Sequence, residues 1–160
     1  MLPMQDFSKY LKGARILLID DSEPFQHLTS EMLKKSGVAS VDIASTLSEG
    51  IQLMNYNVQS IPPEYDLVLM DINLPDGNGM QGCQFITSHA ATYNIPVIVI
   101  SGASKPAVVQ QALTAGASDF MQKPLLSDLL KVRLGMLMKF RAIDSLGAMQ
   151  IQFLLYCSVY

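Results

Sequence analysis

The sequence predicts an α/β fold: a doubly wound, five-stranded parallel sheet with helices on both faces. Short apolar runs alternate with helix-like stretches of roughly ten to fifteen residues, and the loops between them are short. This alternation is typical of right-handed βαβ units, which build a parallel sheet covered on both sides. The 160 residues suffice for one such domain and a short appendage.

Five short runs are expected to form the strands. The runs at residues 67–70 and 96–100 are apolar throughout, which is typical of strands buried on both faces of a sheet. In chain order, the expected strands are residues 15–19, 41–44, 67–70, 96–100 and 119–122.

The stretches between these runs carry helix signals. Ser22 and Pro24 suit the start of the first helix, and Gly37 suits its end. In the second helix, Leu47 and Met54 lie on one apolar face. The expected helices are residues 24–35, 46–57, 80–91 and 105–115, and one that begins near residue 127.

Composition narrows the classes of function. The formal net charge is −3 and the basic residues are scattered, which argues against direct binding of nucleic acid. Cys83 and Cys157 lack the spacing of a zinc site or a disulfide framework, so a reducing compartment is expected. The N-terminal stretch has no apolar core before a cleavage site. We therefore expect no secretion signal and predict a cytoplasmic location.

The expected chemistry lies at the carboxyl ends of the strands, where open α/β sheets bind their ligands. Each polar residue found there would, by itself, be interpreted as a helix cap, a turn residue or a surface lysine. Their joint placement at one edge of the sheet favours a functional site. The residues at these strand ends are Asp20, Asp21, Asp71, Ser101 and Lys123.

The three aspartates predict a hard divalent cation, because close carboxylates repel one another unless a cation lies among them. Mg²⁺ suits such a site, since it keeps several waters and takes one or two carboxylates plus a phosphate. Lys123 and Ser101 can neutralise and hydrogen-bond a transferring phosphoryl group. Asp71 would then be the nucleophile that forms an acyl phosphate.

This set of residues resembles the receiver domain of two-component response regulators. The resemblance runs from about residue 15 to residue 141 and implies a flavodoxin-like strand order, 2-1-3-4-5. It leaves residues 1–14 as an N-terminal arm and residues 142–160 as an apolar C-terminal extension. The matching motifs are Asp20-Asp21, Asp71 followed by Pro75 and Gly79, Ser101 after a VIVI run, and Lys123-Pro124.

The resemblance implies that Asp71 accepts a phosphoryl group from a sensor histidine kinase or a phosphotransfer protein. Mg²⁺, with Mn²⁺ as a substitute, would be held by Asp21, Asp71 and the backbone carbonyl of Asn73. Asp20 would contribute to the metal site mainly through water, and Lys123 would contact the phosphate. The domain would not be an enzyme toward other substrates, because it would catalyse only its own phosphorylation and dephosphorylation.

The resemblance also implies a switch. Ser101 would move to hydrogen-bond the phosphate, and Phe120 would swing inward and change the surface formed by the fourth helix, the fifth strand and the fifth helix. In this chain Ser101 stands where threonine is commoner, and Phe120 lacks the hydroxyl of a tyrosine. A plain core aromatic is an equally weighted interpretation of Phe120.

Two other functions stay open. An aspartate-nucleophile phosphohydrolase would use a second aspartate, two positions after the nucleophile, as its general acid. This chain has Asn73 there, and an amide cannot transfer a proton. The other alternative is a degenerate receiver that serves only as a dimerisation module. Because 160 residues leave no room for an output domain, we expect a stand-alone receiver or a fragment of a longer protein.

The last helix and the tail predict a homodimer. A surface helix of a monomer needs one apolar stripe, whereas this helix is apolar on nearly all sides. The apolar residues 149–160 are too few to span a bilayer, so no membrane contact is expected, and exchange of this segment between subunits is one way to cover it. The alternative is a longer helix folded back on its own domain. Leu126, Leu130, Leu134 and Leu137 form one face, and Leu129, Val132, Met136, Phe140 and Ile143 cover much of the rest.

Overall fold

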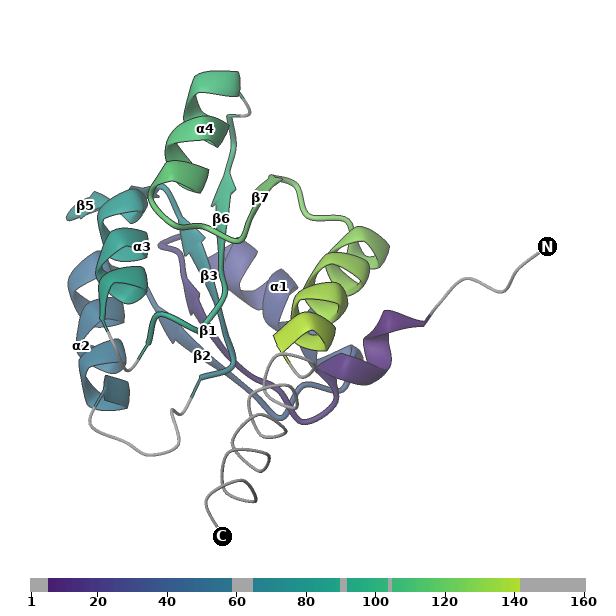
Figure 1. Cartoon of the computed structure of the whole chain (residues 1–160). Helices are drawn as coiled ribbons and strands as arrows, with labels where there is room; N and C mark the ends of the chain where they lie inside the picture. Colours follow the sequence, from purple (N-terminus) through teal and green to yellow (C-terminus); the bar gives the residue numbers. More distant parts are fainter. Residues whose placement is uncertain (1–5, 59–64, 90–91, 104, 142–160) are drawn as a thin grey trace, which may run out of the picture.

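A five-stranded parallel sheet lies at the centre of the protein, with helices on both of its faces (Figure 1). The structure, a computed structural model, describes residues 6–58, 65–89, 92–103 and 105–141. The strands of the main sheet run in the order β2-β1-β3-β6-β7, which is the order 2-1-3-4-5 when only these five strands are counted. The predicted fold class and strand order are therefore confirmed.

The three central strands are apolar because each is covered by helices on both faces. Every residue of β3 and β6 is buried, and in β1 only the first residue is partly exposed. Strand β2 lies at the edge of the sheet and is largely exposed. The strands are β1 (Arg15–Ile19), β2 (Ser40–Ala44), β3 (Leu67–Asp71), β6 (Val97–Ser101) and β7 (Asp119–Gln122).

The helices divide between the two faces of the sheet. Helices α2, α3 and α4 share one apolar core with the sheet, and α1 shares the other with a helix over residues 127–141, here called the C-terminal helix. Figure 1 shows these two groups on opposite sides of the strands. The four labelled helices are α1 (Glu23–Lys35), α2 (Leu47–Val58), α3 (Gly79–Ser88) and α4 (Pro106–Thr114).

Helix α3 ends earlier than the sequence predicts, at Ser88 instead of residue 91. The Thr87 hydroxyl donates to the Cys83 carbonyl at 2.9 Å, and the Ser88 hydroxyl donates to the Phe85 carbonyl at 3.1 Å. Side chains that bond nearby carbonyls in this way compete with continuation of the helix. His89, the next residue, has extended backbone. Residues 90–91 of the predicted helix lie outside the described part of the chain.

Two short elements were not predicted. A 3₁₀ helix, η1 (Phe7–Leu11), forms within the expected N-terminal arm and buries Leu11 completely. It packs against the C-terminal helix at Gly135, where an added Cβ would lie 2.4 Å from the Phe7 carbonyl oxygen. The second element is an antiparallel hairpin directly after β3, made of β4 (Asn73–Leu74) and β5 (Gly77–Asn78).

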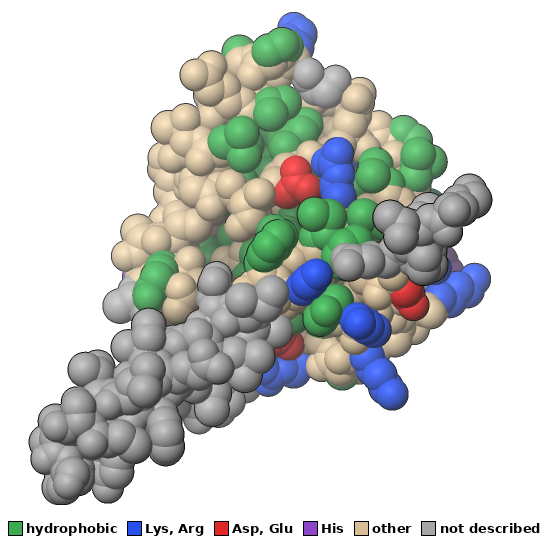
Figure 2. Space-filling view, turned by 45° about the vertical axis from the view of Figure 1, so that its right-hand side comes forward, with side chains coloured by type: hydrophobic (Ala, Val, Ile, Leu, Met, Phe, Trp, Pro, Cys, Tyr) green, Lys and Arg blue, Asp and Glu red, His purple; other side chains and the backbone are tan. Residues whose placement is uncertain are grey.

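The C-terminal helix follows the predicted pattern with one exception. Leu130 and Leu134 are buried against the sheet, as expected. Leu126 precedes the helix and is 64% exposed, so its predicted place on one helical face with Leu130 and Leu134 is wrong. Figure 2, turned toward this side of the molecule, shows apolar side chains in groups between lysine and arginine side chains. The extension over residues 142–160, including Ile143, lies outside the described residues.

Candidate functional site

The parallel strands bring the predicted site residues to one edge of the sheet. Asp20 directly follows β1, Asp71 ends β3, Ser101 ends β6 and Lys123 directly follows β7. The register places Asp71 opposite Ile100, and the Lys123 backbone N–H donates to the Ser101 carbonyl at 2.8 Å. The convergence expected from the alternation of strands and helices is therefore present.

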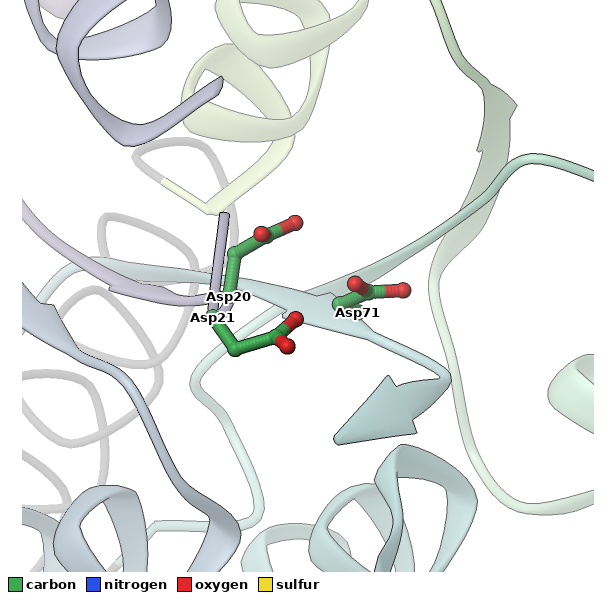
Figure 3. Close-up of side chains that lie close together, drawn as sticks. All are labelled: Asp20, Asp21 and Asp71. Atoms are coloured by element: carbon green, nitrogen blue, oxygen red, sulfur yellow. The ribbon is translucent and has the colours of Figure 1, made fainter. Parts of the chain in front are cut away.

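Three carboxylates form an acidic cluster at this edge. Asp20, Asp21 and Asp71 each offer one oxygen atom, and these atoms lie within 4.8 Å of one another. Asp20 is completely buried and Asp71 is 5% exposed, whereas Asp21 is exposed to solvent. Figure 3 shows that the neighbouring Asp20 and Asp21 side chains diverge and that Asp71 lies across from them.

The Lys123 ammonium joins two of these carboxylates. Its Nζ lies 2.6 Å from Asp20 Oδ2 and 3.2 Å from Asp71 Oδ2. The ammonium also lies over the Phe25 ring, 4.2 Å from the ring centroid, a distance at which cation–π attraction is effective. Sequence reasoning missed Phe25, because no pattern distinguishes it from other aromatics in the first turn of a helix.

The shared surroundings shift the pKa values of the buried partners. Burial raises the pKa of Asp71, and the charge of Asp20 raises it further, while Lys123 acts in the opposite direction. For Lys123, burial lowers the pKa, but the hydrogen bond from its ammonium to Asp20 and the charges of Asp71 and Asp20 outweigh it, so the pKa is raised. Lys123 therefore stays cationic at neutral pH.

The donor set fits a divalent cation. Three carboxylates and one ammonium leave a formal charge of −2 in the cluster. Asp20 Oδ1 accepts from the Ser22 N–H at 2.8 Å and Asp71 Oδ1 from the Asn73 N–H at 3.3 Å. The Asp21 carboxylate makes no hydrogen bond or ion pair with any residue that the structure describes. It is thus available as an oxygen ligand of the kind that Mg²⁺ prefers.

Gly79 lets the chain return closely to Asp71. A Cβ at Gly79 would lie 1.9 Å from the Asp71 carbonyl oxygen, so no other residue fits without moving the backbone. The Gly79 N–H donates to the Ile72 carbonyl at 2.8 Å. The glycine that follows Asp71 by eight positions thus holds the start of α3 against the end of β3.

The two residues predicted to form the switch lie on neighbouring strands, Ser101 at the end of β6 and Phe120 on β7. Ser101 is 2% exposed, and its hydroxyl accepts a hydrogen bond from the Ala103 N–H at 3.1 Å. Phe120, on β7, is half-buried and packs against the core shared by α2, α3 and α4. Both the switch aromatic and the plain core aromatic are compatible with this position.

A profile of the response regulator receiver domain matches residues 16–134. The chain belongs to this family. The resemblance drawn from the sequence is thus confirmed, and the protein is a receiver domain of phosphorelay signalling, whose members are activated by phosphorylation.

Relatives of the receiver domain include regulators and sensor kinases. The cell cycle transcriptional regulator CtrA of Caulobacter vibrioides is 33% identical over 116 residues, which cover 71% of this chain and 46% of CtrA. The two-component response regulator ORR41 of rice is 34% identical over 130 residues, covering 81% of this chain and 96% of ORR41. The sensor kinase/phosphatase CqsS of Vibrio cholerae is 34% identical over 131 residues but is covered to only 18%. The receiver domain thus spans about half of CtrA and a small part of the sensor kinase.

Solved structures share the fold. A two-component response regulator from Clostridium difficile has a TM-score of 0.70 and 25% identity, covering 79% of this chain and 96% of that one. A CheY-like receiver domain protein from Methanospirillum hungatei has a TM-score of 0.70 at 24% identity, with 82% and 98% covered. Within the described ranges, no helix is both long and apolar enough to cross a membrane.

Proposed function

We propose that this receiver domain takes a phosphoryl group on Asp71 from a phosphohistidine of a sensor histidine kinase or a phosphotransfer protein. The single observation that carries the proposal is the Lys123 ammonium, which lies between the buried carboxylates of Asp20 and Asp71 at 2.6 and 3.2 Å. An unpaired cluster of this charge would favour protonation of Asp71. The charge of the Lys123 ammonium opposes this protonation and so favours the ionised, nucleophilic form of the Asp71 carboxylate.

The proposed transfer is a substitution at phosphorus. A carboxylate oxygen of Asp71 attacks, the bond from phosphorus to the imidazole nitrogen breaks, and its electron pair stays on the imidazole. The product is an acyl phosphate. The Lys123 ammonium balances negative charge on the transferred group and gives up part of its contact with Asp71 as it does so. The hydroxyl of Ser101, which ends the neighbouring strand β6, would then donate a hydrogen bond to a phosphoryl oxygen.

Mg²⁺, or Mn²⁺ in its place, would be held by Asp21, Asp71 and the backbone carbonyl of Asn73. When bound, the ion supplies charge neutralisation of the phosphoryl oxygens. Asp20 would contribute through water, because the Lys123 ammonium holds Asp20 Oδ2 at 2.6 Å, more closely than it holds Asp71 Oδ2 at 3.2 Å. The carboxylate of Asp21, which is exposed and has no partner among the described residues, supports this assignment of direct and indirect ligands.

The side chain of Asn73 argues against turnover of external phosphate esters. Asn73 occupies the position where a hydrolase of this type carries its acid, and an amide cannot protonate a leaving group. The domain would therefore promote only its own phosphorylation and dephosphorylation. Sustained hydrolysis of a phosphate ester by the purified protein would contradict this statement. We also propose that the domain acts in the cytoplasm and does not bind nucleic acid.

We further propose that phosphorylation is transmitted by Ser101 and Phe120 to the surface formed by α4, β7 and the C-terminal helix. On that helix, Leu129, Met136 and Phe140 are exposed although they are apolar. A second copy of the chain is the partner that would cover them, with residues 142–160 contributing to the contact. We place the receiver domain at residues 15–141, so residues 1–14 precede it and residues 142–160 follow it.

Incubation with acetyl phosphate and Mg²⁺ tests the proposed phosphoryl transfer. The wild-type protein should give a band that migrates more slowly on a phosphate-retarding gel, and Asp71→Asn should not. Chelation of Mg²⁺ should also abolish the band. Identical behaviour of the wild-type and Asp71→Asn proteins would refute phosphorylation at Asp71.

A further inference from the structure

Asp76 connects the loop after the phosphoacceptor strand to a helix that is distant in sequence. It lies in the turn of the β4–β5 hairpin, and its carboxylate accepts two hydrogen bonds from α2. Leu47 N–H donates to Oδ1 at 2.7 Å, and Ser48 N–H donates to Oδ2 at 2.9 Å. Asp76, which follows Leu47 by 29 positions and Ser48 by 28, therefore caps the first turn of α2.

The remaining donors of this helix end are satisfied locally. The Glu49 N–H donates to Thr46 Oγ1 at 3.1 Å, and the Gly50 N–H donates to the Thr46 carbonyl at 3.1 Å. The Asp76 carboxylate supplies the two acceptors that the local sequence does not. Its negative charge at the helix N-terminus adds a favourable interaction with the helix dipole.

The hairpin that carries Asp76 also touches the acidic cluster. Its first residue, Asn73, donates its N–H to Asp71 Oδ1 at 3.3 Å. Its last residue, Asn78, caps α3 by accepting the Met80 N–H at 2.8 Å. The Leu47 side chain also packs closely against Gly77, where an added Cβ would lie 2.9 Å from Leu47 Cδ2. The hairpin is thus held by α3 at its base and by α2 at its turn.

We propose that Asp76 is a positioning residue for the metal and phosphoacceptor site. By fixing the hairpin turn to the N-terminus of α2, it sets the position of Asn73, whose N–H bonds Asp71 and whose carbonyl is assigned to the metal. This inference rests on the proposed function, because it concerns the same site. Groups that orient a metal ligand without touching the metal commonly change its affinity by about 10- to 100-fold.

The test measures Mg²⁺ binding by calorimetry in three variants of the full chain, with the wild type as reference. Asp76→Ala removes both hydrogen bonds from the hairpin, and Asp76→Asn retains one oxygen acceptor without the charge. Thr46→Ala is the matched control, since it removes a side-chain cap from the same helix end and leaves the Asp76 carboxylate in place. Urea denaturation of each variant establishes that it is folded before it is titrated.

We expect Asp76→Ala to weaken Mg²⁺ binding by about tenfold, Asp76→Asn to have a smaller effect and Thr46→Ala to match the wild type. Phosphorylation of Asp76→Ala by acetyl phosphate should be slow at low Mg²⁺ and should recover at saturating Mg²⁺. Equal Mg²⁺ affinities of Asp76→Ala and the wild type would overturn the inference alone. An equal loss in Thr46→Ala would also overturn it, because the effect would then belong to the helix end. Absence of Mg²⁺ binding by the wild type would overturn the proposed function together with the inference.

Discussion

Asp71 is a buried acid whose surroundings oppose its own negative charge. Burial and the neighbouring Asp20 raise its pKa, and Lys123 only partly compensates. A folded-state pKa above the unfolded-state value means that the folded protein binds the proton more tightly. In the metal-free protein, ionisation of Asp71 therefore lowers the free energy of unfolding. This loss develops as the pH rises from the unfolded-state pKa of about 4 through the raised folded-state pKa.

Replacement of Asp71 by asparagine should therefore stabilise the metal-free protein at neutral pH. The gain in the free energy of unfolding should shrink as the pH falls toward about 4, where the wild-type carboxyl is protonated in both states. Urea denaturation of both proteins at several pH values, in the presence of a chelator, measures this difference. A gain that is constant with pH would show that the charge of Asp71 is not its source.

At the scale of single residues, the sequence is sufficient to place the reactive groups but not to orient them. Asp20 and Asp71 could be assigned to one edge because parallel strands end together. The burial of Asp20 and the exposure of its neighbour Asp21 depend on how β1 continues into α1, which no local pattern specifies. The contact of Phe25 with Lys123 depends on two side-chain rotamers and was equally beyond prediction.

At the scale of elements, the strands were predictable because their apolar composition reflects burial on both faces. The end of α3 was missed because side-chain hydrogen bonds from Thr87 and Ser88 stop the helix in the middle of an otherwise regular pattern. The β4–β5 hairpin and η1 were missed because strands of two residues and a 3₁₀ helix of five residues are too short to show a periodicity. The element that holds Asn73 was thus the least predictable part of the site.

The contact between β3 and α3 gives a prediction for Gly79. Gly79→Ala should lower the free energy of unfolding by about 1–3 kcal/mol and slow phosphorylation, because its Cβ would overlap the Asp71 carbonyl. Gly102→Ala is the matched control, since an added Cβ there meets no atom within 4 Å in the described part of the chain, apart from its two chain neighbours. Its effect on stability should stay within about 0.5 kcal/mol. Urea denaturation of the two variants would contradict this packing argument if both lost the same stability.

At the scale of the whole molecule, the C-terminal helix presents one face to the sheet and leaves another exposed. Leu134 is completely buried, whereas Leu129 is 42% and Phe140 is 56% exposed. Sequence reasoning foresaw an apolar surface on two sides of this helix. It could not assign Leu126, because the helix begins one residue after it. Nor could it foresee that η1 packs against the helix at Gly135.

The exposed apolar stripe of the C-terminal helix, formed by Leu129, Met136 and Phe140, predicts a dimer. This dimer should weaken when the stripe is made polar. The double substitution Leu129→Ser and Phe140→Ser should raise the dimer dissociation constant by about tenfold or more, equivalent to about 1.4 kcal/mol. Tyr93→Ser is the control, because Tyr93 is 59% exposed and lies outside this helix. Sedimentation velocity over a range of concentrations measures the constant. A monomeric wild type, or equal weakening by Tyr93→Ser, would argue against dimerisation through this stripe.

Asp71 is the proposed acceptor of the phosphoryl group, and its identity can be tested directly. Borohydride reduction converts an aspartyl phosphate to homoserine, so peptide mass spectrometry after treatment with acetyl phosphate and Mg²⁺ locates the modified residue. Homoserine should appear at position 71 only, and it should not appear when Mg²⁺ is chelated. Homoserine at position 20 or 21, or no conversion at position 71 under conditions that phosphorylate the protein, would contradict this assignment.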